Sequence, residues 1–300
     1  MGVLEPILAG ILPVVVIAGL GYLLQRRLSI GADDLIKLAV NLLIPALVFD
    51  QLLNTEIAGS VAVAILTAFA LVYLGVLLTS WVIANLFHLS DQLRASFIAT
   101  SLFPNAGNMG LPLALFALGE RGLQIGLIYF LAASVVMNIF GPLLFQGSRF
   151  GGVLQRVIRL PVAWAIALAL VFRWLGWGLP GGVEQAVAML GRAALPVLLI
   201  TLGIQMARTS LHFGVYEFGA AAMRLLVAPA LAWLAGAALG LRDLELAIVV
   251  IFSALPPAVM TYVFSREGTE AERTARVILL TTLLSPFTLA GLLAIFGAQP

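Results

Sequence analysis

The stretch that decides the fold is ASFIATSLFPNAGNMGLPLALFALG, residues 95–119. It is apolar and long enough to cross a lipid bilayer as a helix, which takes about 20 residues. Near its centre it carries two prolines and two glycines: Pro104, Gly107, Gly110 and Pro112. A proline inside a helix removes a hydrogen-bond donor and clashes with the carbonyl four residues earlier. We therefore expect an interrupted helix that resumes near Pro112, because proline suits the first helical position.

A second stretch, LAIVVIFSALPPAVMTYVFS at residues 246–265, has Pro256 and Pro257 at its middle. Irregular backbone at bilayer depth is tolerated only where protein buries it or where it lines a cavity. Each break leaves free N–H groups and a positive dipole end on the second half-helix, which favours a carboxylate. The alternative is a pair of packing kinks that neighbouring helices satisfy. The candidate substrate-binding residues are Pro104, Asn105, Gly107, Asn108, Pro256, Pro257 and Thr261.

The composition of the 300 residues places these stretches in a membrane protein. Apolar residues make up 62 % of the chain and charged residues only 10 %, whereas soluble domains carry about 25 % charged residues. Cysteine is absent, and His88 and His212 are the only histidines. This inventory argues against a disulfide framework, a metal centre or an enzyme, and we expect no cofactor. The net charge of +2 gives no reason to expect a nucleic-acid partner.

Apolar runs bounded by charges or turn residues predict an all-α integral membrane protein with ten transmembrane helices. The runs are residues 5–24, 35–54, 60–87, 93–118, 122–146, 160–177, 185–207, 217–240, 244–265 and 274–297. Lysine and arginine favour the cytoplasmic side, and the loops after odd-numbered runs hold most of them: Arg26, Arg27, Lys37, Arg94, Arg149, Arg156, Arg159, Arg208, Arg266, Arg273 and Arg276. The opposite side holds Arg121, Arg173, Arg192 and Arg242. We therefore expect both termini outside the cytoplasm.

The two halves of the chain are related by a shift of 152 residues. The shift brings Trp81 onto Trp233, Asp91 onto Asp243, Pro104 onto Pro256, and Glu120-Arg121 onto Glu272-Arg273. Each half has five runs, so the halves insert with opposite topology, an arrangement typical of secondary transporters. We expect a first five-helix repeat at 1–148, a cytoplasmic linker at 149–159 and an inverted second repeat at 160–300. The alternative is chance similarity within an apolar sequence.

Three segments resemble the auxin efflux carrier family of membrane transporters. NAGNMGLPL at 105–113 resembles that family's N-x-G-x-x-G-x-P signature, and NLLIPALVF at 41–49 resembles its apolar motif around a proline. The run from LPPAVMTYVFSREG at 255–268 to VILLTTLLS at 277–285 is similar to its ninth and tenth spans.

The resemblance implies a fold shared with bile-acid:sodium symporters, with crossing broken helices four and nine that hold the substrate, and an elevator-like motion. It also implies that Asn105 is the crossover asparagine and that Pro104 and Pro256 are the crossover prolines. The repeat mate of Asn105 is Pro257, so the site is expected to be asymmetric. The family includes plant auxin carriers and bacterial proteins described as malonate or malate permeases.

Several polar groups lie within the predicted spans. Asp50 is either a proton-coupling acid or a residue that reaches the outer interface. Arg224 either contacts substrate or extends to the headgroups, and we favour the second reading. Asn41 and Asn138 are expected to bond across helices rather than to bind a ligand.

The sequence thus predicts a secondary transporter of small organic anions, malonate-like, malate-like or auxin-like, in a bacterial-type inner membrane. Protons or sodium are possible coupling ions, lipid is the surrounding partner and a homodimer is possible. A sodium-coupled symporter is the nearer rival, with freed carbonyls such as those of Thr100 and Phe252 as ion ligands. A receptor or scaffold without transport activity is the more distant alternative.

Overall fold

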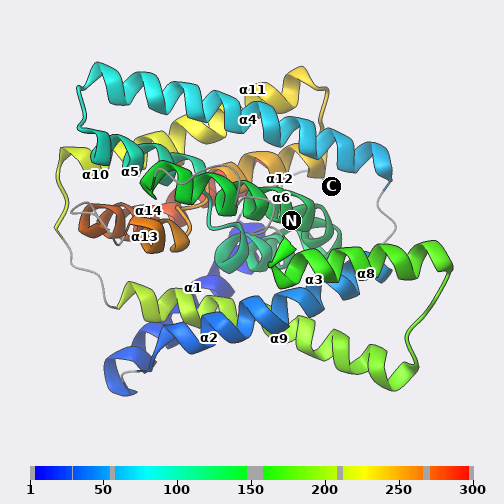
Figure 1. Ribbon diagram of the computed structural model, residues 1–300. Coiled ribbons are helices and arrows are strands. Elements are labelled where there is room, and N and C mark those ends of the chain that lie inside the picture. The colour runs from blue at the N-terminus through cyan, green and yellow to red at the C-terminus, as the bar shows by residue number, and fades with distance from the viewer. Residues whose placement is uncertain are drawn as a thin grey trace. The chain divides into compact units, whose positions relative to one another are not determined.

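The computed structural model describes residues 4–28, 30–54, 58–146, 158–207, 212–265 and 271–296. Helices make up nearly all of these residues (Figure 1). The predicted linker at 149–159 lies outside the described residues, except for its last two. Among the described residues, β-type pairing is confined to one isolated bridge, between Pro104 and Pro257.

The helices follow the predicted runs closely. In the first half they are α1 (Leu4–Leu28), α2 (Ala32–Leu38), η1 (Ala39–Leu43), α3 (Ile44–Asn54), α4 (Gly59–Leu86), α5 (Asp91–Leu102), η2 (Ala106–Gly110) and α6 (Leu111–Gln146). In the second half they are α8 (Pro161–Leu175), α9 (Gly181–Met206), α10 (Val215–Ala222), η4 (Met223–Val227), α11 (Ala228–Ala238), α12 (Asp243–Ser253), α13 (Met260–Ser265) and α14 (Ala271–Phe296). The three segments labelled η are single π-helical turns.

Within the described ranges, seven helices are long and apolar enough to cross a membrane, judged by length and composition. One of them, Ala106–Phe145, spans 40 residues and has a non-helical residue inside, Gly119 at φ 72° and ψ −171°. This positive φ is strained for any residue with a Cβ. The chain therefore bends between the predicted runs 93–118 and 122–146.

The chain divides into two compact units. Unit 1 comprises Met1–Pro13, Gly59–Arg149 and Thr209–Pro300, and unit 2 comprises Val14–Ala58 and Phe150–Arg208. Each unit draws on both halves of the sequence. Both proline-broken stretches belong to unit 1.

The core of unit 1 is built around the aromatic ring of Tyr129 on α6. Its ring centroid lies 5.1 Å from that of Phe69 on α4 and 5.3 Å from that of Phe252 on α12. The Tyr129 hydroxyl is 3.0 Å from Ser253 Oγ. In Figure 1, α4 and α11 run side by side along one edge of this unit, and the two helices are in contact. On α4, the outward face is apolar, as expected against lipid: Val63, Leu66, Leu71, Leu74, Leu78, Trp81 and Val82.

In unit 2, α1 and α9 pack with their backbones in contact. A Cβ at Gly203 would collide with the carbonyl oxygen of Ala18, and one at Gly21 would collide with that of Ile200. Small residues allow this close approach, which is the common way in which helices associate in membranes. In the same unit, Arg173 Nη1 donates to the carbonyl of Leu52 at 2.9 Å, tying α8 to α3.

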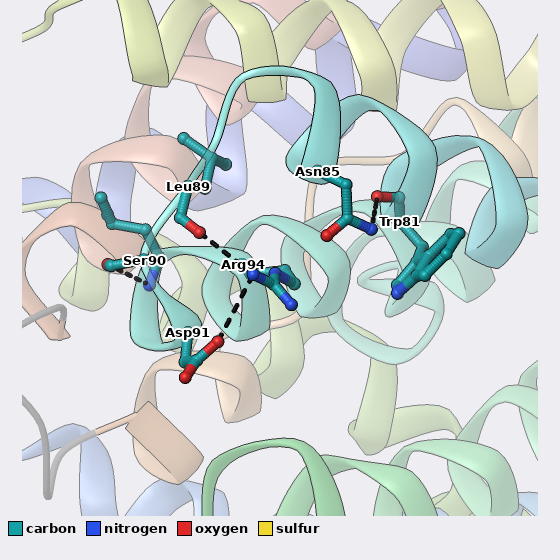
Figure 2. A network of polar contacts seen from close by, with 7 residues as sticks. Trp81, Asn85, Leu89, Ser90, Asp91 and Arg94 are labelled. Carbon is teal, nitrogen blue, oxygen red and sulfur yellow. Dashed lines mark hydrogen bonds and ion pairs between the residues drawn. The ribbon is translucent and has the colours of Figure 1, made fainter.

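The turn between α4 and α5 sets the start of the first broken helix. Ser90 Oγ accepts a hydrogen bond from the Leu93 N–H at 3.4 Å, as a helix N-cap does. Figure 2 shows Ser90 at this turn. Arg94 Nη2 lies 3.4 Å from both the Leu89 carbonyl and Asp91 Oδ1 (Figure 2). These contacts define where α5 begins, one end of the segment that leads to Pro104.

Candidate substrate site at the helix breaks

The first break is short and well ordered by hydrogen bonds. Helix α5 ends at Leu102, Phe103 is extended at φ −96° and ψ 94°, and the helix resumes at Ala106. Asn105 is the N-cap of the resumed helix, because its Oδ1 accepts from the Asn108 N–H at 3.3 Å. Its carbonyl accepts from Met109 at 3.2 Å and from Gly110 at 3.1 Å.

The interruption predicted at Pro104 is therefore confirmed, but the predicted restart was wrong. Pro112 does not open the second half-helix, since η2 and α6 continue without a gap from Ala106. The Asn105 cap and a π-helical turn allow the helix to re-form six residues earlier than expected, so Pro112 lies at the second position of α6.

The second break is formed by the two adjacent prolines. Helix α12 ends at Ser253, and α13 starts at Met260. Pro256 and Pro257 have no backbone N–H to contribute to a helix. Both are buried.

The two unwound segments hydrogen-bond to each other. The Asn105 N–H donates to the Pro256 carbonyl at 2.7 Å, and the Ala258 N–H donates to the Phe103 carbonyl at 2.8 Å. These two bonds flank the antiparallel bridge between Pro104 and Pro257. Buried backbone groups need partners, and here each broken helix supplies those that the other has lost. The two breaks thus form one structural element, which we call the crossover (residues 103–110 and 254–261).

Glycine permits this close approach. A Cβ at Gly110 would lie 2.8 Å from Leu255 Cδ1 and 3.0 Å from Phe252 Cε1. A Cβ at Gly107 would lie 3.0 Å from Phe130 Cε2. Gly107 and Gly110 of the signature therefore allow close packing of the crossover against neighbouring side chains of unit 1.

Two polar groups in the crossover are buried without a partner. The Asn105 side chain is 4 % exposed, and its Nδ2 has no hydrogen-bond partner among the described residues. The Thr261 side chain is fully buried, and its Oγ1 likewise has none among them. An unsatisfied buried polar group costs about 1–3 kcal/mol. Two unsatisfied polar groups in one structural element are expected where a bound ligand supplies the missing hydrogen-bond partners.

Arg224 is the residue near the crossover whose surroundings the sequence reading predicted wrongly. It is 2 % exposed, so it does not extend to the headgroups. Its Nε donates to the Leu255 carbonyl at 2.6 Å, its Nη1 to the Ser101 carbonyl at 2.7 Å and its Nη2 to the Phe252 carbonyl at 3.2 Å. The guanidinium therefore binds both α5 and α12 where these helices end. An arginine within an apolar run was the available signal.

The remaining predicted residues have varied surroundings. Gly107 and Asn108 are half-buried in the crossover. Asp50 is half-exposed in unit 2 and accepts a hydrogen bond from Asn54 Nδ2 at 3.0 Å. Contrary to expectation, Asn41 and Asn138 bond within their own helices, to the carbonyls of Lys37 at 2.8 Å and Ser134 at 2.9 Å.

Comparison with known proteins places this architecture in a family. The profile of the membrane transport protein family matches residues 6–152 and 150–293. The chain belongs to the auxin efflux carrier family of membrane transport proteins. It is therefore a multi-pass membrane transporter rather than an enzyme.

Relatives of this chain are named as transporters or carriers. A protein named uncharacterized transporter from Methanothermobacter thermautotrophicus is 24 % identical over 92 % of this chain and 93 % of its own. A putative malonate transporter of Rhizobium meliloti is 28 % identical over 97 % of this chain and 96 % of its own. A probable auxin efflux carrier component 1b of rice is 30 % identical, but over 38 % of this chain and 22 % of its own.

Proposed function

We propose that this transporter carries small organic anions, malonate-like, malate-like or auxin-like, and binds them at the crossover. The observation that carries the proposal is the buried Asn105 side chain, which caps one half-helix through Oδ1 and leaves Nδ2 without a partner among the described residues. A carboxylate accepts hydrogen bonds from such a neutral donor and from the positive end of the helix that begins at Ala106. Thr261 Oγ1 adds a second donor.

We further propose a ten-span fold of two inverted repeats. The helix positions support it, because a shift of 152 residues carries α5 (91–102) onto residues 243–254, where α12 spans 243–253. The same shift carries α4 (59–86) onto 211–238, where α10, η4 and α11 span 215–238. In this topology the protein spans a bacterial-type inner membrane, and both of its termini lie on the side away from the cytoplasm.

Alternating access would follow an elevator-like motion. Both broken helices belong wholly to unit 1, so a movement of that unit carries the entire crossover with it. Since the crossover is tied by hydrogen bonds between its two halves, it moves as one element.

The test is anion uptake by the purified protein in proteoliposomes. Radiolabelled malonate, malate and indole-3-acetate serve as probes, and Asn105→Ala is compared with Asn138→Ala. Both changes remove a span amide, but Asn138 bonds to its own helix. We expect Asn105→Ala to abolish most uptake while the folded yield is retained, and Asn138→Ala to transport at the wild-type rate. Wild-type uptake by Asn105→Ala would refute the site, and failure of the wild-type protein to transport any organic anion would refute the function.

A further inference from the structure

The first helix of the chain belongs to both compact units. Helix α1 runs without a gap from Leu4 to Leu28, but its residues up to Pro13 belong to unit 1 and those from Val14 onward belong to unit 2. The chain passes between the units four times, after residues 13, 58, 149 and 208. Among the described residues, only the first of these points lies inside a helix. If unit 1 moves while unit 2 stays in place, α1 has to bend or to lose its contacts with one of them.

The N-terminal part of α1 packs closely against unit 1. Gly10 is buried, and a Cβ at this position would lie 2.6 Å from Ala117 Cβ on α6 and 3.3 Å from Leu293 Cδ1 on α14. The missing side chain therefore allows this turn to approach both helices, as small residues commonly do between helices in membranes. We expect this end of α1 to move together with unit 1.

The C-terminal part of α1 packs against α9 of unit 2 by the same face of the helix. One buried face runs along α1 at Gly10, Val14, Ala18 and Gly21. Steps of three and four residues keep positions on one side of a helix. The Ala18 carbonyl leaves no room for a Cβ at Gly203 on α9. A single face of α1 is thus attached to unit 1 in its first part and to unit 2 in its second part.

Pro13 lies between these two attachments and weakens the helix there. It has no N–H to donate to the carbonyl of Ala9, and its ring crowds that carbonyl. Sharp bends in helices occur mostly at prolines. The neighbouring side chains leave room for a bend, because about half of each is exposed: Leu12 53 %, Val15 48 % and Val16 51 %.

The other prolines in the interior of a described helix lie within one unit. Pro142 in α6 and Pro286 in α14 belong to unit 1, and Pro196 in α9 belongs to unit 2. Among these four positions, Pro13 is the one that coincides with a boundary between the units. Pro196 is exposed and offers a matched control within a single unit.

We infer that Pro13 is a hinge in a helix that connects the two units, and that its bending allows unit 1 to move relative to unit 2. Pro13 is a positioning residue, because it acts on this movement and not on the anion. The inference rests on the proposed elevator-like motion and adds to it the residue at which the connecting helix bends.

The first experiment compares uptake by Pro13→Ala and Pro13→Gly in proteoliposomes, with whichever of radiolabelled malonate, malate and indole-3-acetate the wild-type protein transports. Alanine restores the missing N–H and stiffens the helix, so we expect a melting temperature equal to or above that of the wild type. Because such motions often limit turnover, we expect the maximum uptake rate of Pro13→Ala to fall at least about fivefold. Glycine restores the same N–H but keeps the backbone flexible, so Pro13→Gly should transport faster than Pro13→Ala.

Pro196→Ala is the control and should transport at the wild-type rate. Wild-type uptake by Pro13→Ala would overturn the inference and leave the proposed function intact. Equal losses in Pro13→Ala and Pro13→Gly would also overturn it, because they would show that the proline ring is required and not the bend. If the wild-type protein takes up none of the three anions, the proposed function fails, and the second experiment decides the inference by itself.

The second experiment measures the movement without any substrate. The chain has no cysteine, so one spin label can be placed in each unit through Leu78→Cys on α4 and Met189→Cys on α9, which are both exposed positions. With Pro13 present we expect a broad or two-peaked distribution of distances between the labels, and with Pro13→Ala a narrow distribution with one peak. Pro196→Ala should leave the distribution unchanged. The same distribution with Pro13 and with alanine would refute the hinge, and so would one narrow distance in the protein that retains Pro13.

Discussion

The polar side chains of the continuous helices differ from those of the crossover. In the continuous helices, several threonine and asparagine side chains bond locally: Thr67, Thr79, Asn85, Asn138 and Thr281 each donate to the carbonyl four residues earlier. In the crossover, Asn105 Nδ2 and Thr261 Oγ1 are buried and have no partner among the described residues.

The difference follows from the backbone. In an intact helix the carbonyl one turn back is always within reach of a threonine or asparagine side chain. Asn105 precedes the first turn of its helix, so no such carbonyl lies behind it, and its oxygen caps the helix instead. The break at Asn105 therefore leaves a side-chain donor free for a ligand, whereas the intact helix around Asn138 satisfies the same residue type itself.

Among the variants that test this difference, Gly110→Ala is expected to have the largest effect on stability and uptake, because it disturbs the packing of the two broken segments. The new Cβ would lie 2.8 Å from Leu255 Cδ1, so we expect a loss of about 1–3 kcal/mol in stability from overpacking and a marked fall in uptake. Gly75→Ala in α4 is the control, because its Cβ would make ordinary contact with Leu231 Cδ1 at 3.6 Å. The measurement is the melting temperature in detergent together with uptake. Equal melting temperatures would show that the crossover is loosely packed.

Thr261→Val tests the free donor of the second segment. Valine has nearly the same shape, so we expect unchanged or higher stability, because a buried hydroxyl without a protein partner is removed. Uptake should show a several-fold higher KM, since one neutral hydrogen bond is worth about 1 kcal/mol. Thr281→Val, which removes a hydroxyl bonded to the Val277 carbonyl at 2.6 Å, should leave KM unchanged. The prediction fails if both variants have the same KM.

The smallest effect on uptake is expected from a change at Asp50. Like the polar residues of the continuous helices, Asp50 forms a local hydrogen bond, which it accepts from Asn54 Nδ2 at 3.0 Å. We expect Asp50→Asn to change uptake by less than about twofold, in line with the small contribution of exposed polar contacts, and to leave its pH profile unaltered. Uptake measured between pH 5 and pH 8 checks this. A pH profile that becomes flat in the variant would instead assign proton coupling to Asp50.

The sequence predicted much of this fold because its signals are local. Apolar runs fix where helices form in a bilayer, and Pro104, Pro256 and Pro257 fix where two of them break. Asn105 was expected in the crossover because it lies between Pro104 and Pro112 and matches the asparagine of the family signature. The early restart at Ala106 was missed because an asparagine cap and a π-turn can replace the proline start.

The surroundings of Arg224 were not predictable from local patterns. Its direction depends on the π-turn η4, which has no sequence signature, and its three acceptors lie 28 to 123 residues away in the chain. The pairing of Pro104 with Pro257 is likewise a contact between distant segments. The sequence also did not predict that Asn138 bonds within its own helix rather than across helices.

The most direct test of the central claim is an experimental density map of the protein with malonate bound. We predict density for the anion within hydrogen-bond distance of Asn105 Nδ2, at the start of the helix that opens with Ala106, and no such density in Asn105→Ala. Malonate bound elsewhere, or an Asn105 amide satisfied by a protein group in the presence of malonate, would contradict the account.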